Sequence, residues 1–459
     1  MDTKALRQKI LDLAIHGKLV PQDPNDEPAS VLLERIRAEK ERLIKEGKIK
    51  KGKKSAKTSD KPHYPFELPK GWMWCRLEEL CYIKGGKRIP RGFTFSKSKT
   101  KHVYLRVTDM KECSIMLTDL KYIDDDVFEQ IKNYTIDSND LYLTIAGTIG
   151  SVGIIPKEVS GMNLTENAAK LTNISCVKEY LLYALLSSTA QEHFTSKFHQ
   201  VAQPKLSIET ASTTPIALPP INEQIRIVSE IERTLKLIDG INNNRNELQT
   251  AIKQAKRKIL DLAIHGKLVP QDPNDEPATE LLKRINPKAE ITCDNPQYGK
   301  LLKGWCETTL KSLAKEVFAG GDKPTEFTKE KTNGNTIPIY SNGVEKDGLY
   351  GYTNVARVIE PCLTVSARGT IGFTCIRNIP FVPIVRLITI VPNPAFDLKY
   401  MKFCLDCLLI WSEGSSIPQL TVPTIKKIQL PLPPLQEQHR IVAKIEELFA
   451  QLDKIEVSL

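Results

Sequence analysis

The sequence KILDLAIHGKLVPQDPNDEPA occupies Lys9–Ala29 and returns, letter for letter, at Lys258–Ala278. A block that occurs twice requires a search for a complete internal repeat before any single motif is judged. Three further pairs follow in the same order, and each pair keeps a short common signature. They are LPKGWMWCRLEEL with LLKGWCETTLKSL, LTIAGTIG with VSARGTIG, and ALPPINEQIRIVSEIE with PLPPLQEQHRIVAKIE. The chain is therefore a duplicated framework that carries two unlike inserts.

A long helix is predicted after the first LPP signature. Apolar residues recur in steps of three and four from Ile225 to Leu262, interrupted only at Arg245, which is typical of a helix packed along one seam. Glu223 lies in the first turn, where the helix dipole favours a carboxylate. The helix should span roughly Ile221–His265, about 66 Å at ~1.5 Å per residue. Its apolar stripe requires a partner helix.

The two ends of the chain supply that partner. The stripe returns from Val442 to Leu459, but the chain stops at the residue equivalent to Arg245, and Met1 is equivalent to Thr250. The N-terminus thus resumes, within about four missing residues, the helix that the C-terminus leaves unfinished. We interpret the repeat as circularly permuted, with the first and last residues side by side. The alternative is a recent recombination without structural meaning, and gene conversion contributes to the identity of the blocks in either case.

Each insert is predicted to be a domain of the α/β (α+β) class, built mainly of short strands. Short apolar runs such as HVYLRV and LYLTIA alternate with turn-rich segments, and one clear helical stretch stands in each insert. The predicted boundaries are 1–50 for an N-terminal helical segment, with a mobile lysine-rich linker to 62; 63–220 for the first domain; 221–295 for the central helix and a linker; 296–434 for the second domain; and 435–459 for the C-terminal helix.

The composition is that of an ordinary globular protein with a preference for polyanionic partners. The chain has 459 residues, of which 41% are hydrophobic and 26% charged, and its formal net charge is +10. The first residues lack the pattern of an export signal, and no apolar run approaches the ~18 residues of a membrane span, so we expect a cytoplasmic protein. The scattered cysteines indicate reduced thiols rather than a disulfide framework.

Sequence motifs for catalysis are weak throughout. NPAF at Asn393–Phe396 is the nearest string to the Asn-Pro-Pro-aromatic loop of adenine-N6 methyltransferases, but it lacks the second proline and precedes a helix, which favours a turn. No G-x-x-x-x-G-K-[ST] sequence occurs, so nothing indicates a nucleotide-driven motor. The Glu46-Gly47-Lys48 string has the spacing of a nuclease centre but lies in the charged linker, where nothing would fix it.

Candidate metal ligands have equally plain interpretations. Adjacent side chains diverge, so a solvated turn is the better interpretation of Asp124–Asp126. The C-x-x-C at Cys404–Cys407 lies in an apolar helical stretch without a second ligand pair, which favours a core helix. His16 and His265 each precede a glycine at equivalent places in the repeat, and we expect both to cap helix C-termini. The sequence predicts neither a catalytic residue nor a metal site.

A basic protein with two dissimilar domains and no catalytic signature is suited to sequence-specific DNA binding, which needs side chains on base edges and cations on phosphates. In the first domain the candidate DNA-binding residues are Lys84, Lys87, Arg88, Arg91, Arg106 and Lys111. In the second domain they are Lys323, Asn342, Arg357 and Arg368, with Asn342 as a base reader. A single basic residue is more often a solvated surface charge than a DNA contact. The prediction of DNA binding therefore rests on the clusters and not on any one residue.

The layout resembles the specificity subunit of type I restriction-modification systems. The resemblance rests on the paired LPP-x-x-EQ-x-RIV signatures at Leu218–Val228 and Leu432–Val442, the KGW starts at Lys70–Trp72 and Lys303–Trp305, the GTIG strings and the repeated KILDLAIHGKLVPQ. It covers essentially the whole chain. The duplicated LPP signature is quite specific, whereas GTIG alone is weak.

This resemblance implies two target recognition domains joined by two long antiparallel helices with pseudo-twofold symmetry. Each domain would read one half of a bipartite, asymmetric site in double-stranded DNA, while the helices set the spacer. It also implies a non-catalytic subunit bound to two methylation subunits and to restriction subunits, with S-adenosylmethionine, ATP and Mg²⁺ on those partners and no cofactor in this chain. Two alternatives remain: a standalone DNA methyltransferase or nuclease with unrecognised motifs, and a coiled-coil scaffold that binds only proteins.

Overall fold

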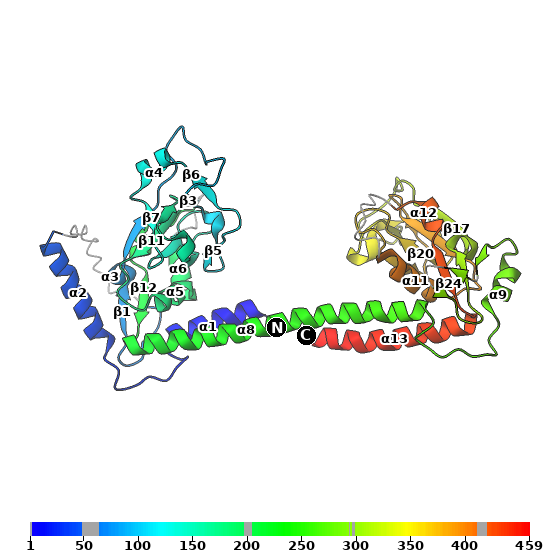
Figure 1. The fold of residues 1–459 in the computed structure, drawn as a ribbon, viewed down its shortest axis with the longest axis horizontal. Coiled ribbons are helices and arrows are strands. Elements are labelled where there is room, and N and C mark those ends of the chain that lie inside the picture. The colour runs from blue at the N-terminus through cyan, green and yellow to red at the C-terminus, as the bar shows by residue number, and fades with distance from the viewer. Residues whose placement is uncertain (1, 48–63, 197–203, 293, 296–298, 411–419) are drawn as a thin grey trace. The chain divides into compact units, whose positions relative to one another are not determined.

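The computed structural model describes residues 2–47, 64–196, 204–292, 294–295, 299–410 and 420–459 (Figure 1). The chain divides into two compact units, unit 1 over Met1–Asn243 and unit 2 over Asn244–Leu459. Most of the predicted lysine-rich linker, including Lys48 of the rejected nuclease string, lies outside the described residues. None of the described helices combines the length and the apolar character that crossing a bilayer requires.

Unit 1 combines helices with short strands, as the sequence predicts. Its helices are α1 (Thr3–Ile15), α2 (Ala29–Lys45), α3 (Leu77–Leu80), α4 (Asp125–Ile131), α5 (Lys178–Leu186), α6 (Ser188–Thr195), α7 (Ile208–Ser212) and the first part of α8 (Ile221–Ile264). Its strands are β1 (Met73–Arg76), β2 (Tyr82–Gly85), β3 (His102–Leu105), β4 (Met110–Lys111), β5 (Ser114–Ile115), β6 (Lys121–Ile123), β7 (Thr135–Ile136), β8 (Leu141–Thr144), β9 (Val152–Ile154), β10 (Met162–Leu164), β11 (Ala168–Thr172) and β12 (Pro215–Leu218).

Unit 2 begins with the second part of α8. Its further helices are α9 (Ala278–Ile285), α10 (Leu310–Leu313), α11 (Leu398–Ile410), α12 (Val422–Lys426) and α13 (Leu435–Ser458). Its strands are β13 (Ile291–Thr292), β14 (Asp294–Asn295), β15 (Gly299–Lys300), β16 (Cys306–Thr309), β17 (Ala314–Ala319), β18 (Ile337–Tyr340), β19 (Leu349–Thr353), β20 (Cys362–Val365), β21 (Thr374–Arg377), β22 (Val382–Pro383), β23 (Ile388–Pro392) and β24 (Gln429–Leu432).

Two antiparallel helices form the frame of unit 1, where α1 lies along the first part of α8 (Figure 1). Arg7 of α1 forms an ion pair with Asp239, far along α8. Gln22, beyond the C-terminal end of α1, bonds Glu223 in the first turn of α8. Because the earlier residue contacts the later part of α8, the two helices run in opposite directions. Their facing side chains share one buried core with α5 and with the β1-β12 and β2-β11-β8-β9 sheets of the inserted domain.

Unit 2 repeats this frame with other helices. α13 lies along the second part of α8 (Figure 1), and the Lys256 ammonium lies 2.6 Å from the Asp453 carboxylate and 3.1 Å from that of Glu456. Ile441 and Ile445 of α13 are fully buried in the core of the unit. The predicted long helix is confirmed to within one residue at its C-terminal end, and each part of it has the partner helix that its apolar stripe required.

The two inserted domains share one strand order although their sequences differ. One sheet has the order β2-β11-β8-β9 in unit 1 and β17-β23-β20-β21 in unit 2. The other has the order β6-β3-β10-β7 in unit 1 and β19-β18-β22 in unit 2, and the pairs β3 with β10 and β18 with β22 are both parallel. The α+β class is confirmed. The two inserts can share a strand order although their sequences are unlike, because strand pairing uses backbone groups that every non-proline residue carries.

A buried tryptophan–carboxylate bond ties each LPP signature to its unit. Trp72 Nε1 donates to the Glu223 carboxylate at 3.0 Å, and Gln22 Nε2 reaches the same carboxylate at 3.4 Å. Trp305 Nε1 donates to Glu437 at 3.0 Å in unit 2. Burial raises the pKa of both carboxyl groups, and the tryptophan hydrogen bonds lower it by less. Glu223 therefore accepts hydrogen bonds as a buried side chain. This role restricts the residue at position 223 more than the predicted interaction with the helix dipole does.

An ion pair completes this connection, and its aspartate comes from the repeated block. Arg226 Nη2 lies 2.5 Å from the Asp26 carboxylate, and Arg440 Nη2 lies 2.6 Å from that of Asp275. Both aspartate side chains are buried. We call the four residues Trp72, Glu223, Asp26 and Arg226, and their unit 2 equivalents Trp305, Glu437, Asp275 and Arg440, the clasp of each unit. Each copy of the block closes its own unit, so recombination without structural meaning is excluded as the explanation of the repeat.

The histidines of the repeated block end their helices as predicted. Nδ1 of His16 and of His265 lies 2.5 and 2.7 Å from the carbonyl oxygen four residues earlier. Gly17 and Gly266 follow with φ of +63° and +65°, the left-handed conformation that commonly ends helices and favours glycine. The block therefore combines a helix stop with the clasp aspartate.

Candidate nucleic-acid interface

The basic segment after β2 has a fixed backbone and exposed cations. The Lys87 N–H donates to the Leu164 carbonyl at 2.9 Å, and the Lys87 carbonyl accepts from the Tyr104 hydroxyl at 2.8 Å. The Lys87 ammonium lies 5.6 Å from the centre of the Tyr134 ring, a cation–π distance. Lys84 is exposed in β2, an edge strand of its sheet. The segment thus presents two lysines from rigid backbone positions.

Arg88 and Arg91 continue the same segment and are both exposed. Arg88 Nε lies 3.3 Å from the Glu166 carboxylate, and the arginine side chain is 72% exposed. An ion pair this exposed contributes little to stability, so Arg88 can exchange the carboxylate for a phosphate at small cost. The structure therefore brings four of the candidate cations of unit 1 together on one connected segment.

Arg106 and Lys111 differ from each other in their surroundings. Arg106 donates to Asp109 through Nη2 at 2.6 Å and Nε at 3.1 Å, and it also reaches Asp119. The Asp109 side chain is buried, so Arg106 neutralises an internal charge. The guanidinium of Arg106 therefore shapes the loop, and its contact with DNA stays a prediction. Lys111, at the end of β4, is exposed.

Two candidate cations of unit 2 lie over aromatic rings. The Lys323 ammonium lies 4.9 Å from the ring centre of Phe327, and the Arg357 guanidinium carbon lies 5.4 Å from that of Phe318. Both cationic residues are exposed. Stacking on a ring limits the conformations of a long side chain. The aliphatic part of each of these side chains is therefore ordered, while its charged end stays in water.

Asn342 has a structural role that the sequence did not reveal. Its Nδ2 donates to the Val385 carbonyl at 2.7 Å, and its Oδ1 accepts from the Ala367 N–H at 2.7 Å. Both ends of the amide are thus used to hold two loops together, and the role of Asn342 as a base reader stays a prediction. Arg368 follows in the GTIG loop and is exposed.

A pocket in unit 1 contains charged and aromatic residues that the sequence analysis missed. Lys170 lies opposite Lys84 in the pairing of β11 with β2, and its ammonium is 3.6 Å from the buried Asp140 carboxylate. The pocket is lined by Lys84, Gly85, Gly86, Asn133, Tyr134, Thr135, Leu164 and Lys170. The sequence did contain a sign of Lys170, since it is the one charged residue in the strand sequence AAKLT. Such a pocket can accept an anionic group.

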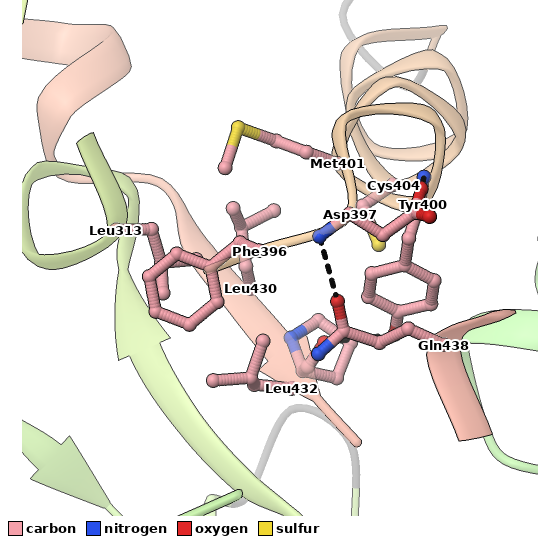
Figure 2. A pocket seen from close by; sticks show the side chains of 10 residues that line it. Leu313, Phe396, Asp397, Tyr400, Met401, Cys404, Leu430, Leu432 and Gln438 are labelled. Atoms are coloured by element: carbon pink, nitrogen blue, oxygen red, sulfur yellow. Dashed lines mark hydrogen bonds between the residues drawn. The ribbon is translucent and has the colours of Figure 1, made fainter. Parts of the chain in front are cut away.

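A pocket in unit 2 is apolar and belongs to the core (Figure 2). It lies between α11, β24 and the start of α13, and its side chains are mainly hydrophobic. Gln438 crosses one end, where its Oε1 accepts from the Asp397 N–H at 3.2 Å (Figure 2). The Gln438 Nε2 donates to the Pro433 carbonyl at 2.9 Å. The glutamine of the EQ signature therefore joins the inserted domain to its frame.

The weak catalytic motifs have structural roles. Burial raises the pKa of the Cys404 and Cys407 thiols to about 12 and about 11, so both are protonated core groups of α11 at neutral pH, as predicted. The NPAF string forms the predicted turn, in which the Phe396 N–H donates to the Asn393 carbonyl at 3.1 Å.

The acidic run begins a helix rather than forming a solvated turn, which corrects the expectation. Asp124 precedes α4, whose first residues are Asp125 and Asp126, because carboxylates favour the N-terminus of a helix. Asp125 also pairs with Lys101 at 3.3 Å. Across the described ranges, no group of three histidine, cysteine, aspartate or glutamate side chains is arranged to hold a metal ion.

Comparisons with known proteins give a consistent result. The sequence matches the family described as "Type I restriction modification DNA specificity domain" over residues 69–250 and 303–457. The specificity subunit of the type I restriction enzyme EcoAI from Escherichia coli is 25% identical over 98% of this chain and 90% of that subunit. The EcoEI specificity subunit from the same species is 32% identical over 61% of this chain and 54% of that subunit, so the aligned part is about half of that relative's length.

A solved structure supports the fold. One chain, from work described as "Structural basis underlying complex assembly and conformational transition of the type I R-M system", aligns with a TM-score of 0.64 at 18% identity. The alignment covers 86% of this chain and 94% of the other. At this level of identity the likeness concerns the fold.

Proposed function

Because this chain belongs to the family of type I restriction-modification DNA specificity domains, we propose that it reads a bipartite DNA site, with one half-site bound by each unit. DNA sequence recognition is the role for which the family is described. One observation carries the proposal: the family match occurs twice, and each match includes one inserted domain with its own exposed cations. Two reading domains in one chain are what a two-part site requires.

The site read is asymmetric. The two domains share a strand order, so both can approach DNA in the same manner. Their side chains differ at equivalent places, since unit 1 presents the segment from Lys84 to Arg91 while unit 2 presents Lys323 and Arg357. Base edges are read by individual side chains, so unlike side chains select unlike half-sites.

The helix α8 sets the spacer between the half-sites. It is one continuous helix from Ile221 to Ile264 and contributes to both units. A helix of this length spans about 66 Å at 1.5 Å per residue, which is an upper bound of about 20 base pairs on the separation of the half-site centres.

The chain acts as a non-catalytic subunit. It directs two methylation subunits, which bring S-adenosylmethionine, and restriction subunits, which bring ATP and Mg²⁺, and the complex works in the cytoplasm. The structural roles found for Cys404, Cys407 and the NPAF turn support this proposal, because each has a place in the fold that needs no chemistry. The test is incubation of the purified chain alone with DNA, Mg²⁺ and S-adenosylmethionine. Methylated or cleaved DNA would favour the enzyme alternative.

Methylome sequencing with and without the gene tests the bipartite reading directly. A methyladenine motif of two short specific parts separated by unread bases should be lost when the gene is deleted, and the full-length gene should restore it. A gene-dependent motif that is continuous would contradict two half-sites. A chain that shows no salt-dependent affinity for DNA would favour the protein scaffold, since phosphate contacts impose a steep salt dependence on DNA binding.

An insertion in α8 tests the spacer. Four residues placed between Asn243 and Asn244 add about 6 Å, close to the rise of two base pairs of DNA, and about 40° of rotation, close to the twist of one base pair. The spacer should lengthen by about one or two base pairs, with both half-sites unchanged. The control replaces Asn243 and Asn244 with alanine at constant length and should leave the motif as it is. An insertion that leaves the spacer unaltered would remove α8 as the determinant.

A further inference from the structure

The turn between β22 and β23 has an unusual backbone for its sequence. Val385 and Arg386 have φ of +53° and +59°, which a β-branched residue adopts only when its surroundings impose it. The turn is closed by the Leu387 N–H, which donates to the Ile384 carbonyl at 3.0 Å. Asn-Gly is the usual sequence where both central residues need positive φ. Both central side chains are exposed, so packing does not explain the choice of valine and arginine.

The neighbouring backbone holds this turn in place. The Val385 N–H donates to the Gly321 carbonyl at 2.9 Å, and the Arg386 N–H donates to the Gly320 carbonyl at 3.0 Å. A Cβ on Gly320 would stand 2.7 Å from a backbone carbon of β22, so only glycine permits this approach. Asn342 fixes the Val385 carbonyl from another loop. The turn is thus a rigid platform from which Arg386 projects into solvent.

Unit 1 has an equivalent turn between β10 and β11, the strands that correspond to β22 and β23. The Ala168 N–H donates to the Thr165 carbonyl at 3.1 Å, so the central residues are Glu166 and Asn167. A Cβ on Gly86 would stand 2.1 Å from the Thr165 carbonyl oxygen, the same close approach as in unit 2. Asn167 is exposed. Glu166 and Asn167 do not have positive φ, so this turn differs in backbone conformation from that of unit 2. A closely approaching glycine nevertheless supports each turn, and the two turns present different side chains.

Cations stand beside both turns. In unit 1 Arg88 pairs with Glu166 of the turn itself, and the neighbouring Lys87 is bonded through its backbone to the end of β10. In unit 2 the Arg357 guanidinium lies next to Gly321, where it would stand 3.0 Å from an added Cβ. Each turn is consequently close to an exposed cation that can contact a phosphate while the turn reaches a base.

We propose that these two turns read bases, with Arg386 selecting a guanine in one half-site and Asn167 selecting an adenine in the other. The inference rests on the proposed bipartite function. Arginine donates two parallel hydrogen bonds to guanine O6 and N7, and asparagine pairs with adenine N6 and N7 in the major groove. Such pairs demand a fixed backbone beneath the side chain, and the close approach of Gly320 in unit 2 and of Gly86 in unit 1 supplies it.

Methylome sequencing of cells that carry full-length variants in place of the chromosomal gene tests the proposal. Arg386→Ala should abolish the preference for guanine at one position of one half-site, a roughly 5- to 100-fold loss of discrimination for a bidentate contact. The other half-site should be unaffected. Asn167→Ala should have the converse effect, on an adenine of the other half-site. Arg386→Lys should keep the charge but lose the paired hydrogen bonds, so discrimination should fall here as well.

Two further variants separate reading from folding. Val385→Asn combined with Arg386→Gly gives the turn its preferred sequence, so the thermal midpoint should rise by about 2–4 °C while guanine discrimination is lost. Lys311→Ala removes an exposed cation from α10, which precedes β17, whereas Gly320 follows β17 at its other end. This control should leave the motif unchanged.

The outcomes are distinguishable. An unchanged motif in both Arg386→Ala and Asn167→Ala would overturn the assignment of the turns. Equal degradation of both half-sites, accompanied by a lower thermal midpoint, would assign the turns to folding and would overturn it too. If the unaltered gene confers no bipartite motif, the proposed function itself fails, and this is seen before any variant is introduced.

Discussion

The indole nitrogen of Trp72 lies 3.0 Å from the carboxylate of Glu223, a residue that is only 1% exposed. Burial raises the pKa of this carboxyl group above its ordinary value, and the bonds from Trp72 and Gln22 oppose the shift without reversing it. The surroundings of Glu223 therefore favour the neutral form of its carboxyl group more than water does. The clasp of unit 1 should accordingly respond to pH.

The first prediction concerns this pH dependence. A carboxyl group whose pKa is higher in the folded than in the unfolded chain binds its proton more tightly when folded, so its contribution to the free energy of unfolding is complete below about pH 4.3, the unfolded value. That contribution is lost as pH rises through the folded value. The Glu223→Gln variant cannot ionise at this position. Urea denaturation between pH 4 and pH 7 should therefore show the free energy of unfolding of the variant rising relative to that of the wild type as pH rises. A difference that stays constant with pH would contradict the prediction.

The second prediction concerns the ion pair of the clasp. Arg226→Ala should lower the free energy of unfolding of unit 1 by about 1–3 kcal/mol, because the Asp26 carboxylate, only 5% exposed, is left unpaired. Arg440→Ala should do the same in unit 2, where Asp275 is 8% exposed. Arg233→Ala is the control, since Arg233 pairs with Glu230 on the exposed side of α8 and such pairs contribute about 0.5 kcal/mol or less. Equal effects of Arg226→Ala and Arg233→Ala in denaturation experiments would disprove the role of the clasp.

The third prediction separates two kinds of candidate cation in unit 1. Lys87→Ala and Arg91→Ala should each weaken DNA binding across all sequences and reduce the slope of log binding constant against log salt by about 1, because one phosphate contact is lost. Arg106→Ala should instead lower the thermal midpoint, since the buried Asp109 loses its partner. Titrations of the assembled complex with DNA at several salt concentrations, with thermal denaturation in parallel, provide both measurements. A salt slope that Lys87→Ala leaves unchanged would exclude Lys87 from the interface.

The fold was predictable where a periodic pattern of apolar residues extends over many residues. The apolar stripe of α8 persists for many turns, so its bounds were predicted to within one residue. The shared strand order of the two inserts could not be predicted, since backbone hydrogen bonds leave no trace in short, unlike strands. The Trp72–Glu223 bond joins residues far apart in the sequence, and nothing local to either residue indicates the other.

The candidate interface was predictable as clusters but not residue by residue. The cations Lys84, Lys87, Arg88 and Arg91 are all exposed, which composition could indicate. The backbone bonds of Asn342 could not be predicted, because an amide serves backbone groups as well as bases and only the fold shows which backbone groups it meets. The ion pair of Arg106 with Asp109 did have a local signal, because Asp109 stands only three residues after Arg106.

The fourth prediction concerns the two ends of the chain. The apolar stripe predicts that Met1 resumes the helix of Leu459 after about four residues. A rearranged chain, with residues 244–459 first, a linker of sequence NELQ, and residues 1–243 last, should therefore fold and direct methylation to the same motif as the natural order. The same rearrangement with a linker of four glycines is the control, and it should be less stable because glycine disfavours a helix. A rearranged chain that folds but directs methylation to a different spacer would show that the ends do not adjoin.

The identical blocks create a problem of partner choice during protein synthesis. Either copy can offer its aspartate to either arginine, since Asp26 and Asp275 lie in the same sequence and form the same bond. On the ribosome the choice is made by timing. Domains generally fold as units from the N-terminus during synthesis. Arg226 leaves the exit tunnel before Asp275 has been translated. The first unit therefore closes on Asp26, which lies in the only copy of the block that has been made by then. A chain diluted from denaturant has no such order and can exchange its blocks, so the newly made protein reaches its native pairing by a route that refolding lacks.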